Sequence, residues 1–264
     1  MGTPLKNPPV YFTLAQVRFN PILKLADYLP EIQEGFRHQG YPDFETQHGF
    51  AIQLHVQDNN SAAQALPQHI HQERYLIGNV ERTHSFILDR ESLTIQSTNY
   101  GHFENFSKIF LDGLLIVHKV VELAYTERVG LRFLDRVMPR EDETVDQYLA
   151  DHIQGLKSKL GGKPVYSYAE AMNEVDDIKL VSRVAIQHGP LAFPPDIQPG
   201  QLAVMKKFLS YAGPSATLDN DGFIERRESF SERSLSTHLE AIHKVIGDAF
   251  KVTVTPYAFT VWDK

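Results

Sequence analysis

Three side chains at alternate positions, His69, His71 and Glu73, are residue types that could bind a metal ion. Alternate side chains of an extended segment point to one side, so two imidazoles and a carboxylate at this spacing could coordinate zinc. The chain contains 12 His, however, and close His pairs are then expected without any function. We therefore expect a solvated segment that leads into a strand, with no metal and no other cofactor. If a metal is found, these three residues are the ligands to test first.

Arginines on two strand-like segments form a second group of candidates. Arg18 and Arg132 each lie between two apolar residues, in the strings Val-Arg-Phe and Leu-Arg-Phe, and Arg128 and Arg136 flank Arg132 at a spacing of four. Because side chains alternate along a strand, the apolar neighbours face one side and these arginines the other. Two explanations are open: an ion pair with Asp or Glu of a neighbouring strand, or a polar face that binds an acidic peptide or an anionic ligand. Arg18, Arg132 and Arg136 are the candidate residues for binding a ligand or partner.

Two further strings resemble known motifs but are incomplete. Residues 161–163, Gly-Gly-Lys, resemble part of a phosphate-binding loop, but Pro164 stands where Ser or Thr would coordinate magnesium. Residues 219–222, Asp-Asn-Asp-Gly, begin like a calcium-binding loop without the residues that complete it, so we predict a hairpin turn there. The nucleophile elbow, the dinucleotide fingerprint and the zinc-protease helix motif are absent. We assign no catalytic residue, and the sequence favours a protein without enzymatic activity.

The composition narrows the function classes. The chain has 264 residues, of which 42% are hydrophobic and 22% charged, as is typical of a soluble globular protein. The absence of Cys excludes disulfides, thiol catalysis and Cys-ligated metal sites. A net charge of −7 argues against nonspecific binding to nucleic acid or to an anionic membrane. Since we also find no secretory signal and no long apolar run, we expect a cytoplasmic protein.

Three long helices are predicted from apolar residues at spacings of three and four, at residues 25–38, 103–123 and 231–250. The apolar stripe of the second helix consists of Phe103, Phe106, Phe110, Leu114, Val117 and Val121. The stripe of the third consists of Leu235, Leu239, Ile242 and Ile246. Each stripe occupies one side of its helix, so these helices are expected to cover a sheet.

Strands are predicted where apolar and polar residues alternate or where β-branched and aromatic residues cluster. In the first half of the chain they are residues 10–19, 50–56, 75–80, 85–89 and 92–97. In the second half they are residues 128–137, 178–187, 201–211 and 216–227, with residues 252–262 as a last strand or extended tail. A further helix is predicted at residues 145–160, and an irregular Pro-rich loop at residues 189–200.

The order strand, helix, about four strands, helix therefore occurs twice. Matching strings support a duplication, such as Val-Arg-Phe at residues 17–19 with Leu-Arg-Phe at 131–133. Val-His-Lys-Val-Val at residues 117–121 likewise matches Ile-His-Lys-Val-Ile at 242–246. We predict an α+β fold of two pseudo-symmetric β-α-β(4)-α halves, residues 1–125 and 126–264, with antiparallel sheets and the long helices on one face. Two ferredoxin-like units are the competing arrangement.

This element order resembles the TATA-binding protein and the related helix-grip folds, which says nothing about DNA binding. Several strings also resemble a sporadically distributed bacterial family of proteins of about this length. They are Pro-Pro-Val at residues 8–10, Phe-Asn-Pro at 19–21, Gly-Tyr-Pro at 40–42, the central Gly-Leu-Arg-Phe at 130–133 and residues 250–262. The resemblance implies no activity and no catalytic residues. Its patchy distribution is similar to that of mobile defence, toxin–antitoxin or regulatory genes.

These observations favour a non-enzymatic binding or interaction protein, such as a component of a bacterial defence or toxin–antitoxin system. Its partner would be another protein or a small anionic ligand. The alternative is a helix-grip protein that binds a small molecule, or performs hydrolase or cyclase chemistry, in a cavity between sheet and helices. An open sheet face with exposed Arg and aromatic residues would favour the first hypothesis, and a large buried cavity lined by Tyr and His the second.

Overall fold

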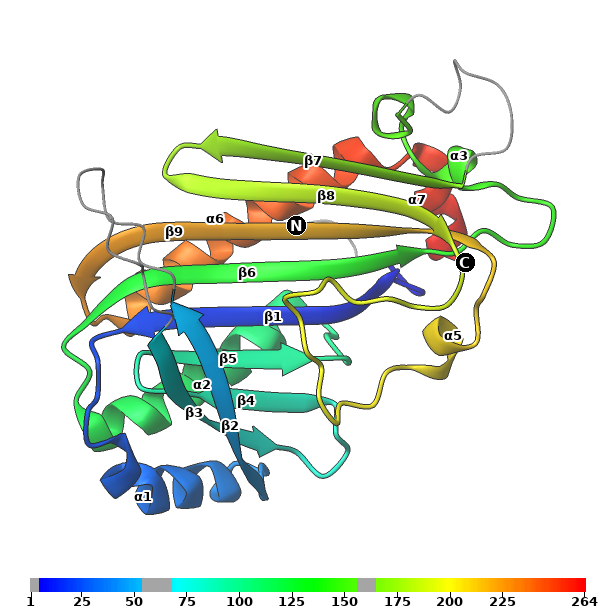
Figure 1. Cartoon of the computed structure of the whole chain (residues 1–264). Coiled ribbons are helices and arrows are strands. Elements are labelled where there is room, and N and C mark those ends of the chain that lie inside the picture. Colours follow the sequence, from blue (N-terminus) through cyan, green and yellow to red (C-terminus); the bar gives the residue numbers. More distant parts are fainter. Residues whose placement is uncertain (1–4, 54–67, 156–164) are drawn as a thin grey trace, which may run out of the picture.

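A single antiparallel sheet of nine strands forms the centre of the protein in the computed structural model, which describes residues 5–53, 68–155 and 165–264 (Figure 1). The strand order across the sheet is β2-β3-β4-β5-β1-β6-β9-β8-β7. The strands are β1 (Val10–Phe19), β2 (Asp43–Gln53), β3 (Gln68–Gly78), β4 (His84–Leu88), β5 (Ser92–Ser97), β6 (Tyr125–Val137), β7 (Tyr166–Val175), β8 (Ile178–His188) and β9 (Pro214–Ser229). The fold is therefore a mixture of helices and antiparallel strands, as the sequence predicts.

The helices are α1 (Leu25–His38), α2 (Phe103–Val121), α3 (Val145–Tyr148), α5 (Lys206–Leu209), α6 (Glu232–Thr253) and α7 (Pro256–Trp262), with a 3-10 turn, η1, at Asp151–Ile153. Figure 1 shows α2 and α6 behind the sheet. All three long helices are confirmed, within a few residues at their ends. Ser231 precedes α6 as its N-cap, and its side chain accepts a hydrogen bond from the Ser234 N–H.

The apolar stripes of α2 and α6 face the core that lies between these helices and the sheet. All the predicted stripe residues of α6, and all of those of α2 except the half-buried Val121, are buried. They pack against the buried side chains of β1, β6 and neighbouring strands, such as Val17 and Leu131. Gly222 on β9 allows α6 close to the sheet, because a Cβ there would lie 2.7 Å from Ile242 Cγ2.

Strands β1 and β6 meet at the middle of the sheet, and their register decides which arginines are neighbours. Arg18 on β1 lies directly opposite Arg128 on β6, and Arg132 lies opposite Leu14. Residues directly opposite each other point to the same face of a sheet. The sequence string around Arg18 matches the string around Arg132. In the structure, however, the cross-strand neighbour of Arg18 is Arg128.

The hairpin turn predicted at residues 219–222 is wrong. These residues lie inside β9, where Asp219 to Gly222 pair with β6 on one side and with β8 on the other. The Asp-Asn-Asp-Gly string is typical of turns only when no neighbouring strand satisfies its backbone. Here both edges of β9 are paired, and two of the string's polar side chains find partners, since Arg132 binds Asp219 and Ser182 binds Asn220.

Three other predicted elements of the second half are also wrong. The helix predicted at residues 145–160 ends at Tyr148, because Leu149 forms a β-bridge with Val254 and is buried against α7. The last part of this prediction, residues 156–160, lies outside the described residues. The strand predicted at residues 201–211 is a loop that contains the short helix α5. The segment at 252–262 is mostly α7, whose start is favoured by Thr255 as N-cap and by the proline that follows it. Strand β7 was not anticipated.

No described helix is long and apolar enough to cross a membrane.

Candidate functional site

The face of the sheet opposite α2 and α6 carries the candidate site. Figure 1 shows residues 189–213, which connect β8 to β9, crossing in front of this face. The predicted irregular loop at 189–200 is the first part of this connection. The loop covers only part of the face, so the face has a closed end under the loop and a second end, which we call the open end, that the loop does not cover. The arginines of β6 occupy both.

Arg132 ties the loop to the sheet. Its Nε and Nη2 each donate to a carboxylate oxygen of Asp219 on β9 at 2.7 Å, and Nη1 donates to Asp196 of the loop at 2.5 Å. The Arg132 side chain is 6% exposed and that of Asp219 is 4% exposed. The hydrogen bond from Arg132 also lowers the pKa of Asp196. Arg132 thus forms the ion pair with a neighbouring strand that was one of the two explanations from the sequence.

Arg136 fixes both ends of the same loop through neutral groups. It is 1% exposed, and its guanidinium donates to the backbone oxygens of Phe208 at 2.5 Å and of Gly189 at 2.8 Å. A third hydrogen bond reaches Ser215 Oγ at 3.3 Å. Arg132 and Arg136 are therefore engaged inside the protein.

Arg18 is the candidate that remains at the surface. Its side chain is 47% exposed, and its one ion pair among the described residues is with Glu91, at 3.7 Å. An exposed pair at this distance contributes little to stability. The structure therefore separates the three candidate arginines: Arg18 is accessible, and Arg132 and Arg136 are not.

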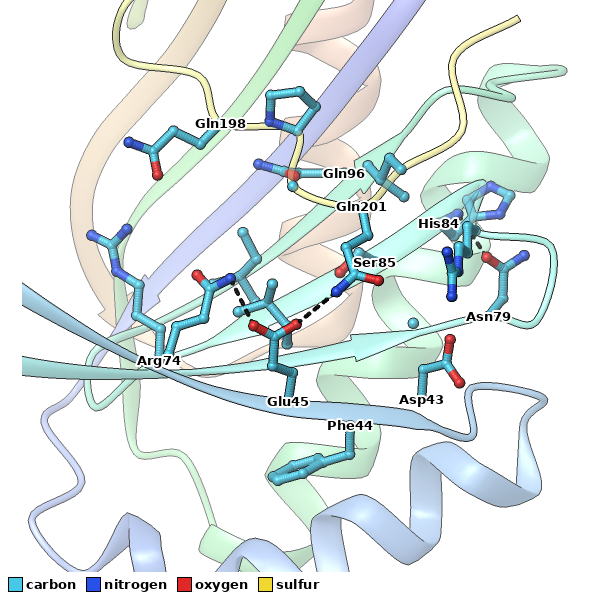
Figure 2. A pocket seen from close by; sticks show the side chains of 18 of the residues that line it. Asp43, Phe44, Glu45, Arg74, Asn79, His84, Ser85, Gln96, Gln198 and Gln201 are labelled. Carbon is cyan, nitrogen blue, oxygen red and sulfur yellow. Dashed lines mark hydrogen bonds between the residues drawn. The ribbon is translucent and has the colours of Figure 1, made fainter.

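A cavity of about 460 Å³ lies between the β2–β3 hairpin and residues 195–202 of the loop, with β4 and β5 as its floor. Figure 2 shows Glu45, Arg74, Gln96 and Gln201 directed into it, whereas Phe44 points away. Gln201 Nε2 donates to Glu45 Oε2 at 3.3 Å across the cavity. Amides are frequent in the lining, which also includes Gln47, Asn79 and Gln198.

A second cavity of about 340 Å³ adjoins the first and extends over β1 and β6. The two cavities share Arg74, Ile87, Gln96 and Asp196 in their linings, so together they occupy one stretch of this face. We call it the sheet groove. It runs from the β2–β3 hairpin, past the loop, to the open end of the face at β6 and β9.

The charges along the sheet groove are mixed. The second cavity is lined by three arginines and three aspartates, namely Arg74, Arg128, Arg132, Asp89, Asp196 and Asp221. Burial raises the pKa of Asp221, and burial lowers the pKa of Arg128. This balance favours a ligand with several neutral polar groups and few charges over a polyanion.

The proposed metal ligands are only partly within the described structure. The side chains of His69 and His71 lie outside the described residues. Glu73 accepts a hydrogen bond from the Tyr75 hydroxyl at 2.9 Å and lies 3.6 Å from Nδ1 of His48. Within the described ranges, no three His, Asp or Glu side chains are grouped so that they could hold a metal ion.

Sequence reasoning missed the amides of the sheet groove and the residues of the loop that close it. Gln96, Gln198 and Gln201 belong to no motif, and they converge only because strand β5 and the loop are brought together by the fold. The backbone at Ala203 shows how: its N–H donates to Arg82 O at 2.7 Å, and its oxygen accepts from Thr98 Oγ1 at 2.8 Å. One local signal in the sequence was Gly130 within the predicted strand, because a glycine inside a strand often marks the close approach of another group to the backbone.

No protein-family model matches this chain, and no curated protein is significantly similar to it.

Proposed function

We propose that this is a non-enzymatic binding protein that holds an extended segment of another protein in the sheet groove. The observation that carries the proposal is that the two cavities adjoin, share four lining residues and lie on the face of the sheet opposite α2 and α6. A groove open along a sheet suits a linear ligand better than a compact one. The loop forms one wall of the first cavity, so a bound segment would be enclosed on two sides there.

The chemistry of the lining supports a polypeptide as the ligand. Each peptide unit offers one N–H donor and one C=O acceptor, and a Gln or Asn side chain can satisfy both at once. Gln47, Gln96, Gln198 and Gln201 supply four such groups in the first cavity. Nucleic acid would require an excess of positive charge, which the mixed lining lacks.

A small polar molecule is the second candidate, and one observation favours it. The first cavity, at about 460 Å³, falls within the usual range for small-molecule sites. Most such sites are predominantly apolar, however, and this one is lined mainly by amides and charged side chains. We therefore place the helix-grip alternative, with or without hydrolase or cyclase chemistry, second.

We also propose that the chain arose by duplication of one α+β unit. The support is that β1 and β6, the first strand of each half, lie side by side at the middle of the sheet, and that each half contains a long helix after its last strand, α2 or α6. The resemblance to a patchily distributed bacterial family further supports a cytoplasmic role in a defence or toxin–antitoxin system. Conserved neighbouring genes of those classes would support this assignment, and unrelated neighbours would count against it.

Selection from a random peptide library tests the binding function. Ile87 lies in the floor of both cavities and is half-buried, so Ile87→Trp should block the sheet groove. Lys119 is exposed on α2, so Lys119→Trp is the matched control. We expect the wild type and Lys119→Trp to enrich the same peptides, and Ile87→Trp to lose them.

Circular dichroism melts confirm that the variants are folded, and Gln201→Trp, on the exposed loop, replaces Ile87→Trp if that variant fails to fold. The proposal is overturned if no peptide is enriched, or if the enriched peptides bind the blocked variant as well as the wild type. Native mass spectrometry separates the second candidate: a small molecule retained by the wild type and absent from Ile87→Trp would favour it.

A further inference from the structure

The guanidinium of Arg128 lies in the second cavity with most of its donors unused. Its Cζ lies 4.4 Å from the ring centroid of Phe223, and its Nη1 donates to Gln16 Oε1 at 3.1 Å. An arginine has five N–H donors, and no other hydrogen bond or ion pair connects Arg128 to the part of the chain that the structure describes. Four of its donors thus have no hydrogen-bond partner among the described residues, and the side chain lines the second cavity.

The surroundings hold this guanidinium in a defined position. Gln16 is itself fixed, because its Nε2 donates to Thr94 Oγ1 at 3.0 Å. Gly130, two residues along β6, leaves the space that the guanidinium occupies, since a Cβ there would lie 2.9 Å from Arg128 Nη1. Phe223, Gln16 and Gly130 together reduce the entropy that Arg128 would lose on binding a ligand.

A second positive charge lies directly opposite Arg128 on the neighbouring strand β1. Arg18 pairs with Arg128 in the β1–β6 register, so the two side chains project from the same face. Like charges at directly opposed positions destabilise a sheet. Glu225 lies directly opposite Arg128 on β9 and offsets part of this repulsion, and an anion between the two arginines would offset more of it. Arg18 is half-exposed and lies 3.7 Å from Glu91, so it can turn toward a ligand at little cost.

The nearby carboxylates do not neutralise Arg128 by direct contact. On β9, Glu225 lies directly opposite Arg128 but is bound by Lys179 at 2.9 Å. The charges of Asp221 and Glu225 act on Arg128, but neither carboxylate forms a hydrogen bond or ion pair with it within the described structure. The contrast with Arg183 on β8 is clear, because Arg183 donates to Glu170 at 2.7 Å and to Asp219 at 3.3 Å. Unlike Arg183, Arg128 donates no hydrogen bond to a carboxylate of the described chain.

We propose that Arg128, assisted by Arg18 opposite, binds a carboxylate of the ligand in the sheet groove. For an extended protein segment, this carboxylate is the free C-terminus. This inference rests on the proposed function and adds the direction of the bound segment. The C-terminus of the segment would lie at β6, and its chain would run from there past Gln96 toward the β2–β3 hairpin. A planar carboxylate fits the guanidinium with two parallel hydrogen bonds. The aspartates that line the cavity disfavour a doubly charged phosphate.

NMR titration tests this site with defined probes. The probes are N-acetyl-Gly-Gly, which ends in a carboxylate, its C-terminal amide, acetate and inorganic phosphate. We expect N-acetyl-Gly-Gly to shift the Arg128 Nε–H resonance in a saturable manner and to leave that of the buried Arg132 unchanged. The amide should bind about 10- to 100-fold more weakly, as expected for losing hydrogen bonds to a charged group.

Acetate distinguishes the two sources of the carboxylate. Acetate binding as tightly as N-acetyl-Gly-Gly assigns the site to small organic acids, and tighter binding of N-acetyl-Gly-Gly assigns it to peptide C-termini. Phosphate binding more tightly than either would overturn the assignment to a carboxylate. Arg128→Ala should abolish the saturable shifts elsewhere in the cavity, and Arg128→Lys should weaken them. Arg226→Ala, which removes an exposed arginine bound to Asp177, is the matched control.

The outcomes separate this inference from the proposed function. The peptides from the library selection are resynthesised with free and amidated C-termini. If both forms bind the wild type equally and fail to bind Ile87→Trp, the groove function stands and the carboxylate site is wrong. If N-acetyl-Gly-Gly and acetate bind at Arg128 and the library yields no peptide, the carboxylate site stands and the peptide function is wrong.

Discussion

The arginines of strand β6 lie on one face of the sheet, and their surroundings differ between its closed end and its open end. At the closed end, Arg132 and Arg136 are buried, and protein groups occupy their donors. At the open end, Arg128 uses one donor and faces a cavity. The three residues are spaced by four along one strand and project from the same face. The comparison shows that an arginine's role here is decided by what lies above the sheet.

The loop at residues 189–213 makes the difference. It brings Asp196 to Arg132 and the backbone oxygens of Gly189 and Phe208 to Arg136. Beyond its edge no segment of the described chain supplies such partners to Arg128. The arginines of the closed end therefore hold a long connection in place, whereas Arg128 at the open end has only one hydrogen bond within the described structure, as the proposed carboxylate site requires.

The largest effect is expected at the closed end. Replacing Arg132 by Ala leaves Asp219 buried without its main partner, so we expect the free energy of unfolding to fall by about 3–5 kcal/mol. Urea denaturation at neutral pH measures this. Arg226→Ala removes the two ion pairs of an exposed arginine, with Asp177 and Glu228, and should cost less than about 1 kcal/mol. A loss below about 1 kcal/mol for Arg132→Ala would contradict the structural role.

The next effect concerns Asp135, which neighbours Arg136 on β6 and faces the opposite side. Burial raises the pKa of Asp135 to about 7, well above about 3.9 for an unfolded chain. A carboxyl with a raised pKa in the folded state destabilises the fold once it ionises. The wild type should therefore lose up to roughly 4 kcal/mol as pH rises from about 4 to 7.

Asp135→Asn cannot ionise, so it tests this sign directly. We expect its stability relative to the wild type to increase from pH 4 to pH 7 and to remain constant above that. Thermal or urea denaturation across the pH range measures both curves. Parallel curves would show that the Asp135 carboxyl is not the group that titrates.

The smallest effects on stability are expected at the open end. Arg18→Ala removes an exposed charge, so the free energy of unfolding should change by about 0.5 kcal/mol or less. Arg128→Ala removes the hydrogen bond to Gln16 and the contact with Phe223, so it should cost about 1 kcal/mol, still less than Arg132→Ala. The same urea experiments measure it. A loss as large as that of Arg132→Ala would abolish the distinction between the two ends and assign Arg128 a structural role.

Much of the fold was predictable from local patterns. The stripes of α2 and α6 appeared at helical spacing, and most strands of the first half appeared as alternations or as β-branched and aromatic clusters. The errors lie mainly in the second half, where the turn string at residues 219–222 is paired on both sides. Residues 145–160 failed for a similar reason, because the Leu149–Val254 bridge ends the helix. Local propensity is overridden where a distant segment offers better burial and hydrogen bonds.

The amino-acid sequence by itself determined that Arg128, Arg132 and Arg136 share one face of a strand, because side chains alternate in extended backbone. It also placed Arg18 on a matching strand. Only the tertiary structure decided their partners: Asp196 is 64 residues from Arg132, and Gly189 is 53 residues from Arg136. The register that sets Arg18 beside Arg128 is likewise tertiary. Such contacts depend on how far a loop extends over the sheet and on how two strands align, and no local pattern encodes either.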